Sequence, residues 1–127
     1  MSKLLTPLEL KVMNILWDIS KGFVRDILDH WEEDEEKKPA YNTVSTIVRI
    51  LKDKEYVDVI AHGRSHEYFP LISRECYQEQ FLDNAISNVF QGKLNQLVST
   101  LIDSEQIDQQ ELSALKQLIE RKKQDQQ

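Results

Sequence analysis

The sequence predicts a mainly α-helical protein with one small β-hairpin, in which an N-terminal domain (residues 1–72) is followed by a helical module (residues 73–127). Three observations support this prediction. Apolar residues recur at helical spacing before residue 55, alternate with polar residues after residue 56, and return to helical spacing from residue 73 onward. With 127 residues, 40% of them hydrophobic and 30% charged, the chain has the composition of a folded globular protein.

The first helix is expected to begin after Thr6. Residues 6–9 are a threonine, a proline, a leucine and a glutamate, which is the pattern of a capping box with proline at the first helical position. Trp17 ends the apolar run before residues 18–22 break the helix. The residues expected to form its buried face are Leu8, Val12, Ile15 and Leu16.

A second, short helix is expected next, followed by a charged connection. Its apolar stripe consists of Val24, Ile27, Leu28 and Trp31. Residues 32–36 are all acidic, and clustered charge without apolar residues is expected to stay in solvent.

The third helix, over about residues 41–54, has two contrasting faces. Its apolar stripe consists of Val44, Ile47, Val48 and Leu51. The side chains that project on the opposite side are Asn42, Ser45, Thr46 and Arg49. An exposed helix surface usually carries Glu and Lys, whereas Ser, Thr and Asn lower helix stability. These short polar groups favour close approach to DNA base edges, and an ordinary solvent-facing surface is the alternative.

A β-hairpin is expected after Tyr56, because Val57, Val59 and Ala61 alternate with polar residues up to a turn at residues 63–65. Residues 66–71 form the second strand. Three helices followed by a hairpin make up a winged helix-turn-helix, in which one helix enters the major groove of DNA. Arg64 lies at the tip of the wing.

Three amphipathic helices are expected after Ser73, and they offer more apolar surface than so slender a module covers by itself. Pairing of two copies is the simplest way to cover this surface, since two-fold dimers are the commonest oligomers. A monomer whose helices fold back on the first domain is the alternative. The residues expected in the dimer interface are Tyr77, Phe81, Leu94, Leu97, Val98, Leu101 and Leu115.

The charge and cysteine content constrain the partners of the chain. The net charge of −6 is unusual for a DNA-binding protein, but residues 40–71 are locally close to neutral. No apolar run approaches the roughly 20 residues needed to span a bilayer, which favours a cytoplasmic location. Cys76 has no partner cysteine in the chain and is expected to be a buried structural thiol.

Catalytic and metal-binding motifs find no support. No nucleophile stands beside a positioned base, and three glycines provide no phosphate-binding loop. His62 and His66 could approach each other across the expected hairpin as two metal ligands. We expect them instead to be surface histidines of the wing, because no third ligand has a suitable spacing for a metal. We therefore expect neither an enzyme nor a metal site nor a cofactor.

Four blocks of the sequence stand in the order and spacing of a known family. The first is residues 5–9 with residues 12–13 and 16–17, and the second is residues 24–27. The third runs from residue 40 through Arg49 and Lys54, and the fourth joins residues 63–64 to residues 68–70. On these blocks the chain resembles the penicillinase-repressor family of bacterial winged-helix regulators, the BlaI/MecI type, over essentially its whole length.

The resemblance implies a homodimer that occupies a palindromic operator in double-stranded DNA until a membrane-bound sensor metalloprotease inactivates it. It implies that Arg64 meets the DNA backbone from the wing. The residues that it implies for the major groove are Asn42, Thr43, Ser45, Thr46 and Arg49.

The sequence departs from the family pattern at three points. Ile50 stands where many relatives have an arginine. The Asn-Phe bond that is cut in penicillinase repressors falls near Thr100-Leu101, which has neither residue. The cysteine cluster of copper-responsive relatives is absent, which disfavours copper sensing.

The sequence thus predicts a transcriptional repressor that binds a palindromic operator as a homodimer and that a membrane sensor protease relieves. The alternative is a winged-helix protein-interaction module without DNA binding, which the acidic net charge and Ile50 favour.

Overall fold

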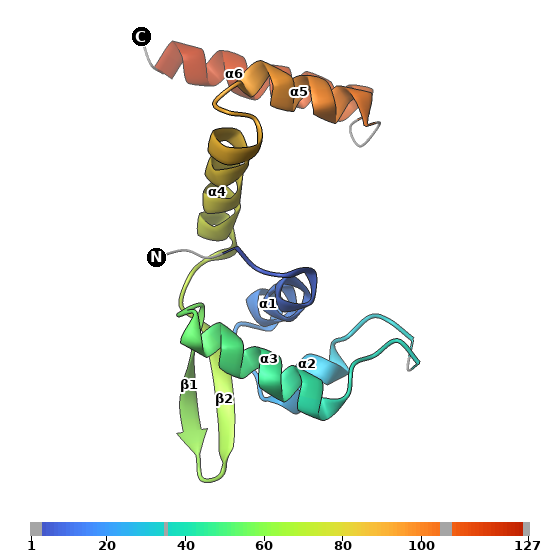
Figure 1. Cartoon of the computed structure of the whole chain (residues 1–127), viewed down its shortest axis with the longest axis vertical. Helices are drawn as coiled ribbons and strands as arrows, with labels where there is room; N and C mark the ends of the chain where they lie inside the picture. The colour runs from blue at the N-terminus through green and yellow to red at the C-terminus, as the bar shows by residue number, and fades with distance from the viewer. Residues whose placement is uncertain (1–3, 35, 105–107, 126–127) are drawn as a thin grey trace. The chain divides into compact units, whose positions relative to one another are not determined.

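The structure is a computed structural model that describes residues 4–34, 36–104 and 108–125. The described elements confirm a mainly helical fold with an antiparallel hairpin (Figure 1). In chain order they are α1 (Pro7–Ile19), α2 (Val24–Asp29), α3 (Tyr41–Asp53), β1 (Val57–His62), β2 (Ser65–Pro70), α4 (Arg74–Asn84), the π-helix η1 (Ala85–Val89), α5 (Leu94–Asp103) and α6 (Gln109–Asp125).

The chain forms two compact units, Met1–Phe81 and Leu82–Gln127. The sequence indicated a division after residue 72, whereas the first unit continues into α4. The reason is Tyr77, which lies on α4 and is buried in the core of the first unit. The assignment of the C-terminal part to dimerisation stays a prediction.

The capping box at the start of α1 is confirmed. The backbone N–H of Glu9 donates to the Thr6 hydroxyl at 3.3 Å, and the backbone N–H of Thr6 donates to the Glu9 carboxylate at 2.9 Å. The expectation that Leu8 is buried is wrong, because the buried stripe of α1 begins one residue later. The buried members of this stripe are Glu9, Val12, Met13 and Leu16.

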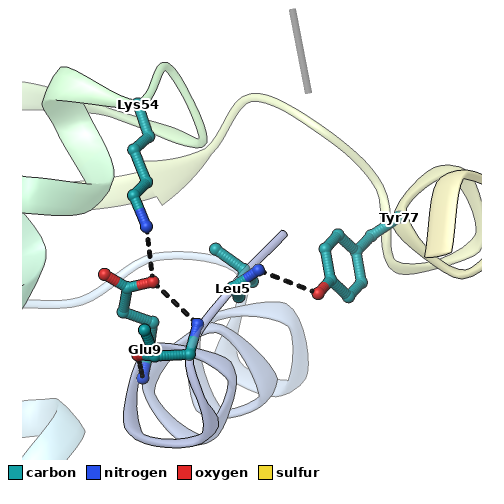
Figure 2. A network of polar contacts seen from close by, with 5 residues as sticks. Leu5, Glu9, Lys54 and Tyr77 are labelled. Carbon is teal, nitrogen blue, oxygen red and sulfur yellow. Dashed lines mark hydrogen bonds and ion pairs between the residues drawn. The ribbon is translucent and has the colours of Figure 1, made fainter. Parts of the chain in front are cut away.

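Glu9 occupies a core position because it has a cationic partner there. Its carboxylate accepts a hydrogen bond from the Lys54 ammonium at 2.8 Å, and the two side chains are only 6% and 20% exposed (Figure 2). Lys54 immediately follows α3. A buried carboxylate without a partner would be strongly unfavourable, so this ion pair joins the start of α1 to the end of α3.

Helix α3 packs against α1, α2 and β1 through its apolar stripe. The four stripe residues expected from the sequence, Val44, Ile47, Val48 and Leu51, are all buried, which confirms this prediction. Helix α2 lacks a capping side chain at Phe23, but the Asp26 carboxylate accepts the Phe23 N–H at 2.9 Å and satisfies it from within the helix.

The hairpin is tied to the loop that follows α1. Strands β1 and β2 pair from Val57 with Pro70 to His62 with Ser65, and the hairpin extends away from the helices (Figure 1). The N–H groups of Gly22 and Tyr68 donate to each other's carbonyls at 2.9 and 2.8 Å. A side chain at Gly22 would lie 2.7 Å from the Ile19 methyl carbon, so glycine permits this close approach.

The connection from β2 to α4 is held against α1 by two side chains. The indole N–H of Trp17 donates to the Ile72 carbonyl at 2.8 Å. Arg74 donates to the Asp18 carboxylate at 2.8 Å and to the Asn14 carbonyl at 3.1 Å, and its guanidinium lies 5.4 Å from the centre of the Trp17 ring. These contacts fix where α4 begins.

Tyr77 completes this attachment. Its hydroxyl accepts the backbone N–H of Leu5 at 3.1 Å (Figure 2), and its ring lies 5.9 Å from the ring centres of Trp17 and Tyr56. Tyr77 therefore belongs to the core of the first unit. Cys76, its neighbour on α4, is exposed, and the expectation of a buried thiol is wrong.

The second unit is helical throughout its described elements. A second capping box starts α6, in which Asp108 accepts the Glu111 N–H at 2.8 Å and Glu111 accepts the Asp108 N–H at 3.4 Å. Among the residues that the structure describes, no helix combines the length and apolarity that crossing a membrane requires.

The Glu9 ion pair makes stability depend on pH. Burial raises the pKa of the Glu9 carboxyl, but hydrogen bonds from Lys54 and Thr6 and the charge of Lys54 outweigh burial and hold the pKa below its usual value of 4.5. A lowered pKa in the folded state means that the stabilisation is present above the unfolded-state value. It is lost as the pH falls through the folded-state pKa.

We expect Glu9→Gln to lower the free energy of unfolding at pH 7 by about 1.5 to 3 kcal/mol, the range for hydrogen bonds to charged groups. The difference from the unsubstituted chain should shrink as the pH falls below 4.5. Urea denaturation at several pH values measures both effects, with the exposed Glu32→Gln as the matched control. Equal unfolding free energies for Glu9→Gln and the unsubstituted chain at pH 7 would contradict a stabilising role.

Candidate nucleic-acid interface

The polar residues singled out on α3 lie on its solvent-facing side. Asn42, Thr43, Thr46 and Arg49 are exposed and Ser45 is half-buried. This arrangement follows from the buried stripe, since residues about half a turn away from buried positions must face solvent. Their role in binding DNA stays a prediction.

Two hydrogen bonds within α3 order this surface. The Thr46 hydroxyl donates to the Asn42 carbonyl at 2.9 Å, and the Arg49 guanidinium donates to the Ser45 hydroxyl at 3.0 Å. A guanidinium has five N–H donors, so the bond to Ser45 leaves others for a ligand. The Arg49 side chain is therefore held along α3, and its remaining N–H groups are available to donate to a ligand.

A concavity with a volume of about 1140 Å³ lies between α3, the start of α2 and the hairpin. The residues that line it are Phe23, Val24, Arg25, Asp26, Tyr41, Ser45, Arg49, Lys52, Asp53, Val59, His62, Arg64, Ser65, His66 and Tyr68. We call it the α3–hairpin concavity. It brings together two of the residues predicted from α3 and the predicted wing residue Arg64.

The α3–hairpin concavity is cationic, although the chain as a whole is acidic. Its positive lining residues are Arg25, Arg49, Lys52 and Arg64, and its negative ones are Asp26 and Asp53. Four positive charges against two negative ones leave an excess of two, in a chain with a net charge of −6. This surface therefore attracts anions such as phosphate groups.

Sequence reasoning did not assign Arg25, Lys52 or Tyr41 to the site. Arg25 lies on α2 and Lys52 near the end of α3, and only the packing of α2, α3 and the hairpin brings them to one surface. A local signal was available for Lys52, which follows Arg49 by three residues and therefore lies on a neighbouring part of the same helix face.

Arg64 lies at the exposed tip of the hairpin, as expected. The two-residue turn between His62 and Ser65 has Gly63 at φ +64°, a conformation that glycine adopts without strain. The turn thus places the Arg64 guanidinium at the end of the hairpin.

The two hairpin histidines do not face each other. The strand register pairs His62 with Ser65 and His66 with Ala61. The His62 ring contacts Glu67 at 3.2 Å and lies 5.5 Å from the ring centre of Phe23. Among the described residues, no three histidine, cysteine or acidic side chains are grouped as metal ligands would be.

Tyr68 forms part of the wall of the concavity and is buried. Burial raises the pKa of its hydroxyl, and this effect outweighs the nearby positive charge of Arg49, which lowers it. The phenol is therefore neutral at physiological pH and keeps its proton as a hydrogen-bond donor.

The residues predicted for a dimer interface differ in exposure. Tyr77 is buried in the first unit, which leaves little of it for a partner. Phe81, Leu94 and Leu101 are exposed, whereas Leu97, Val98 and Leu115 are half-buried. Further large apolar side chains that the sequence prediction omitted are also exposed, and they are Leu82, Val89 and Ile102.

Three helices followed by an antiparallel hairpin, with α3 exposing a polar face, define a winged helix-turn-helix. The fold is similar to the solution structure of the DNA binding domain of the repressor BlaI, with a TM-score of 0.50 and 24% identity. This likeness covers 61% of the present chain and 94% of that domain. Residues 5–121 match the Penicillinase repressor family, and the chain belongs to this family.

The chain also matches individual regulatory proteins over most of their length. The chain is 24% identical over 114 residues to the methicillin resistance regulatory protein MecI of Staphylococcus aureus (strain N315), covering 90% of this chain and 91% of MecI. It is 24% identical over 115 residues to the penicillinase repressor of Bacillus licheniformis, and the match covers 91% of this chain and 88% of that repressor. Family membership places the chain among repressors rather than enzymes.

Proposed function

We propose that this chain represses transcription by binding a palindromic DNA site as a homodimer. The observation that supports the proposal is the cationic α3–hairpin concavity, because an excess of positive charge beside an exposed polar helix suits a DNA backbone and its major groove. Arg25, Lys52 and Arg64 would contact phosphates and set the register of the helix. Base choice would come from Asn42, Thr43, Ser45, Thr46 and Arg49 on α3.

Dimerisation through the second unit is supported by its exposed apolar side chains. Val89 is 67% exposed and Leu94 is 54% exposed in the single chain. Burying apolar surface contributes about 25 cal/mol per Å², so a second copy covering these residues would be favoured. Two copies would present two α3 helices to half-sites about one helical turn of DNA apart, or a multiple of it.

Relief by a membrane-bound sensor protease is part of the proposal and is supported by the family resemblance alone. The segment that corresponds to the family's cleavage point lies within α5, at Thr100-Leu101. Neither residue matches the Asn-Phe pair, so a protease acting on this chain would need to recognise a different bond.

Selection of fragments from the source genome by the purified chain tests the proposed function. We expect an enriched site with two-fold symmetry, and an affinity that falls about a thousandfold or more between 50 and 200 mM salt if the dimer makes six to ten phosphate contacts. A chain that binds no duplex at either salt concentration would instead be a protein-interaction module.

Two substitutions then separate base contacts from phosphate contacts. Arg49→Ala should weaken binding to the selected site by about 1 to 3 kcal/mol and relax its sequence preference, if the guanidinium contacts a guanine. Lys52→Ala should weaken binding to all duplexes similarly and lower the salt dependence. Lys11→Ala, which removes a lysine paired with Glu33 on another surface, is the control. Unchanged affinity and preference in Arg49→Ala would reject its assigned role.

For the dimer, we expect Leu94→Glu to shift the chain to a monomer, because it places a charge among the exposed apolar residues of the second unit. Gln96→Glu adds the same charge on another side of α5 and should leave the assembly intact. Sedimentation equilibrium measures both. A Leu94→Glu variant that remains a dimer would place the interface elsewhere.

A further inference from the structure

Ile50 is an apolar residue on the exposed side of α3 that the packing of the first unit does not explain. It is 39% exposed, whereas the neighbouring Ile47 is 7% exposed. Ile50 belongs neither to the buried core nor to the partly buried residues packed against it. A β-branched residue also has a lower helix propensity than the lysine or glutamate that usually occupies an exposed position.

Thr46 lies one helical turn before Ile50 and provides a second apolar group. Its hydroxyl proton is engaged by the Asn42 carbonyl at 2.9 Å. This bond leaves the methyl group and an oxygen lone pair of Thr46 for a ligand. Side chains four residues apart on a helix are neighbours, so Thr46 and Ile50 form an apolar pair beside the polar track of Ser45 and Arg49.

The major groove of DNA contains one apolar group that such a pair fits, the 5-methyl group of thymine. We infer that Ile50 and Thr46 determine part of the sequence specificity by contacting thymine methyl groups. The inference rests on the proposed DNA binding and adds the base that these two residues select. Four residues of helix span about 6 Å, and successive base pairs are about 3.4 Å apart. The two thymines should therefore lie within about two base-pair steps of each other.

The test uses duplexes that the purified full chain selects from a random-sequence library. Each thymine of the selected site is replaced in turn by deoxyuridine, which differs only in lacking the 5-methyl group. We expect about a fourfold loss of affinity at each of two positions per half-site, the effect of removing one buried methylene-sized group.

Variants assign each position to a side chain. At one of these positions, Ile50→Ala should no longer distinguish the duplex with thymine from the duplex with deoxyuridine. Thr46→Ser keeps the hydroxyl and removes the methyl group. This variant should lose the distinction between thymine and deoxyuridine at the other position. Leu71→Ala removes an exposed leucine outside α3 and should keep the full discrimination at both positions.

The outcomes distinguish this inference from the proposed function. A selected site at which every deoxyuridine is tolerated would overturn the inference and leave DNA binding intact. Discrimination that persists unchanged in Ile50→Ala and in Thr46→Ser would overturn the assignment to these residues. A library that yields no bound duplex would overturn the proposed function and the inference together.

Discussion

The burial of one stripe of α3 determines which residues this helix can offer to a ligand. Val44, Val48 and Leu51 are completely buried, and Ile47 is nearly so. Burying each side chain of this kind contributes about 1.5 to 3 kcal/mol, whereas one hydrogen bond contributes about 1 kcal/mol. Rolling the helix to present another face would therefore cost more than any single polar contact could return. The exposed position of Arg49 and Ile50 follows from this constraint.

The surroundings of α3 are fixed by contacts that lie far apart in the sequence. The Glu9–Lys54 ion pair holds the end of α3 to the start of α1, and the backbone pairing of Gly22 with Tyr68 holds the hairpin to the loop after α1. The first contact positions α3 against α1, and the second positions β2, which carries Tyr68 in the wall of the α3–hairpin concavity. The concavity has a positive charge excess in an otherwise acidic chain, because cationic side chains from α2, α3 and the hairpin tip lie along it.

Features set by neighbouring residues could be predicted from the sequence. The capping box of α1, the buried stripe of α3 and the turn before the second strand all depend on local spacing. Long-range packing decided the rest. Glu9 takes the core position expected for Leu8 because Lys54 reaches it, and Tyr77 is buried because Trp17 and Tyr56 receive its ring. Arg25 of α2 likewise reaches the concavity only through the packing of α2 against α3, which the sequence spacing does not reveal. The family assignment was possible because it rests on order and spacing.

The proposed function requires the exposed side of α3 and the hairpin tip to contact DNA together. Amide chemical-shift mapping of the isotopically labelled chain, titrated with a duplex that it selects, measures this contact residue by residue. We predict the largest changes at residues 42–50 and 63–65. Changes confined to surfaces outside α2, α3 and the hairpin would place the DNA contact elsewhere on the chain.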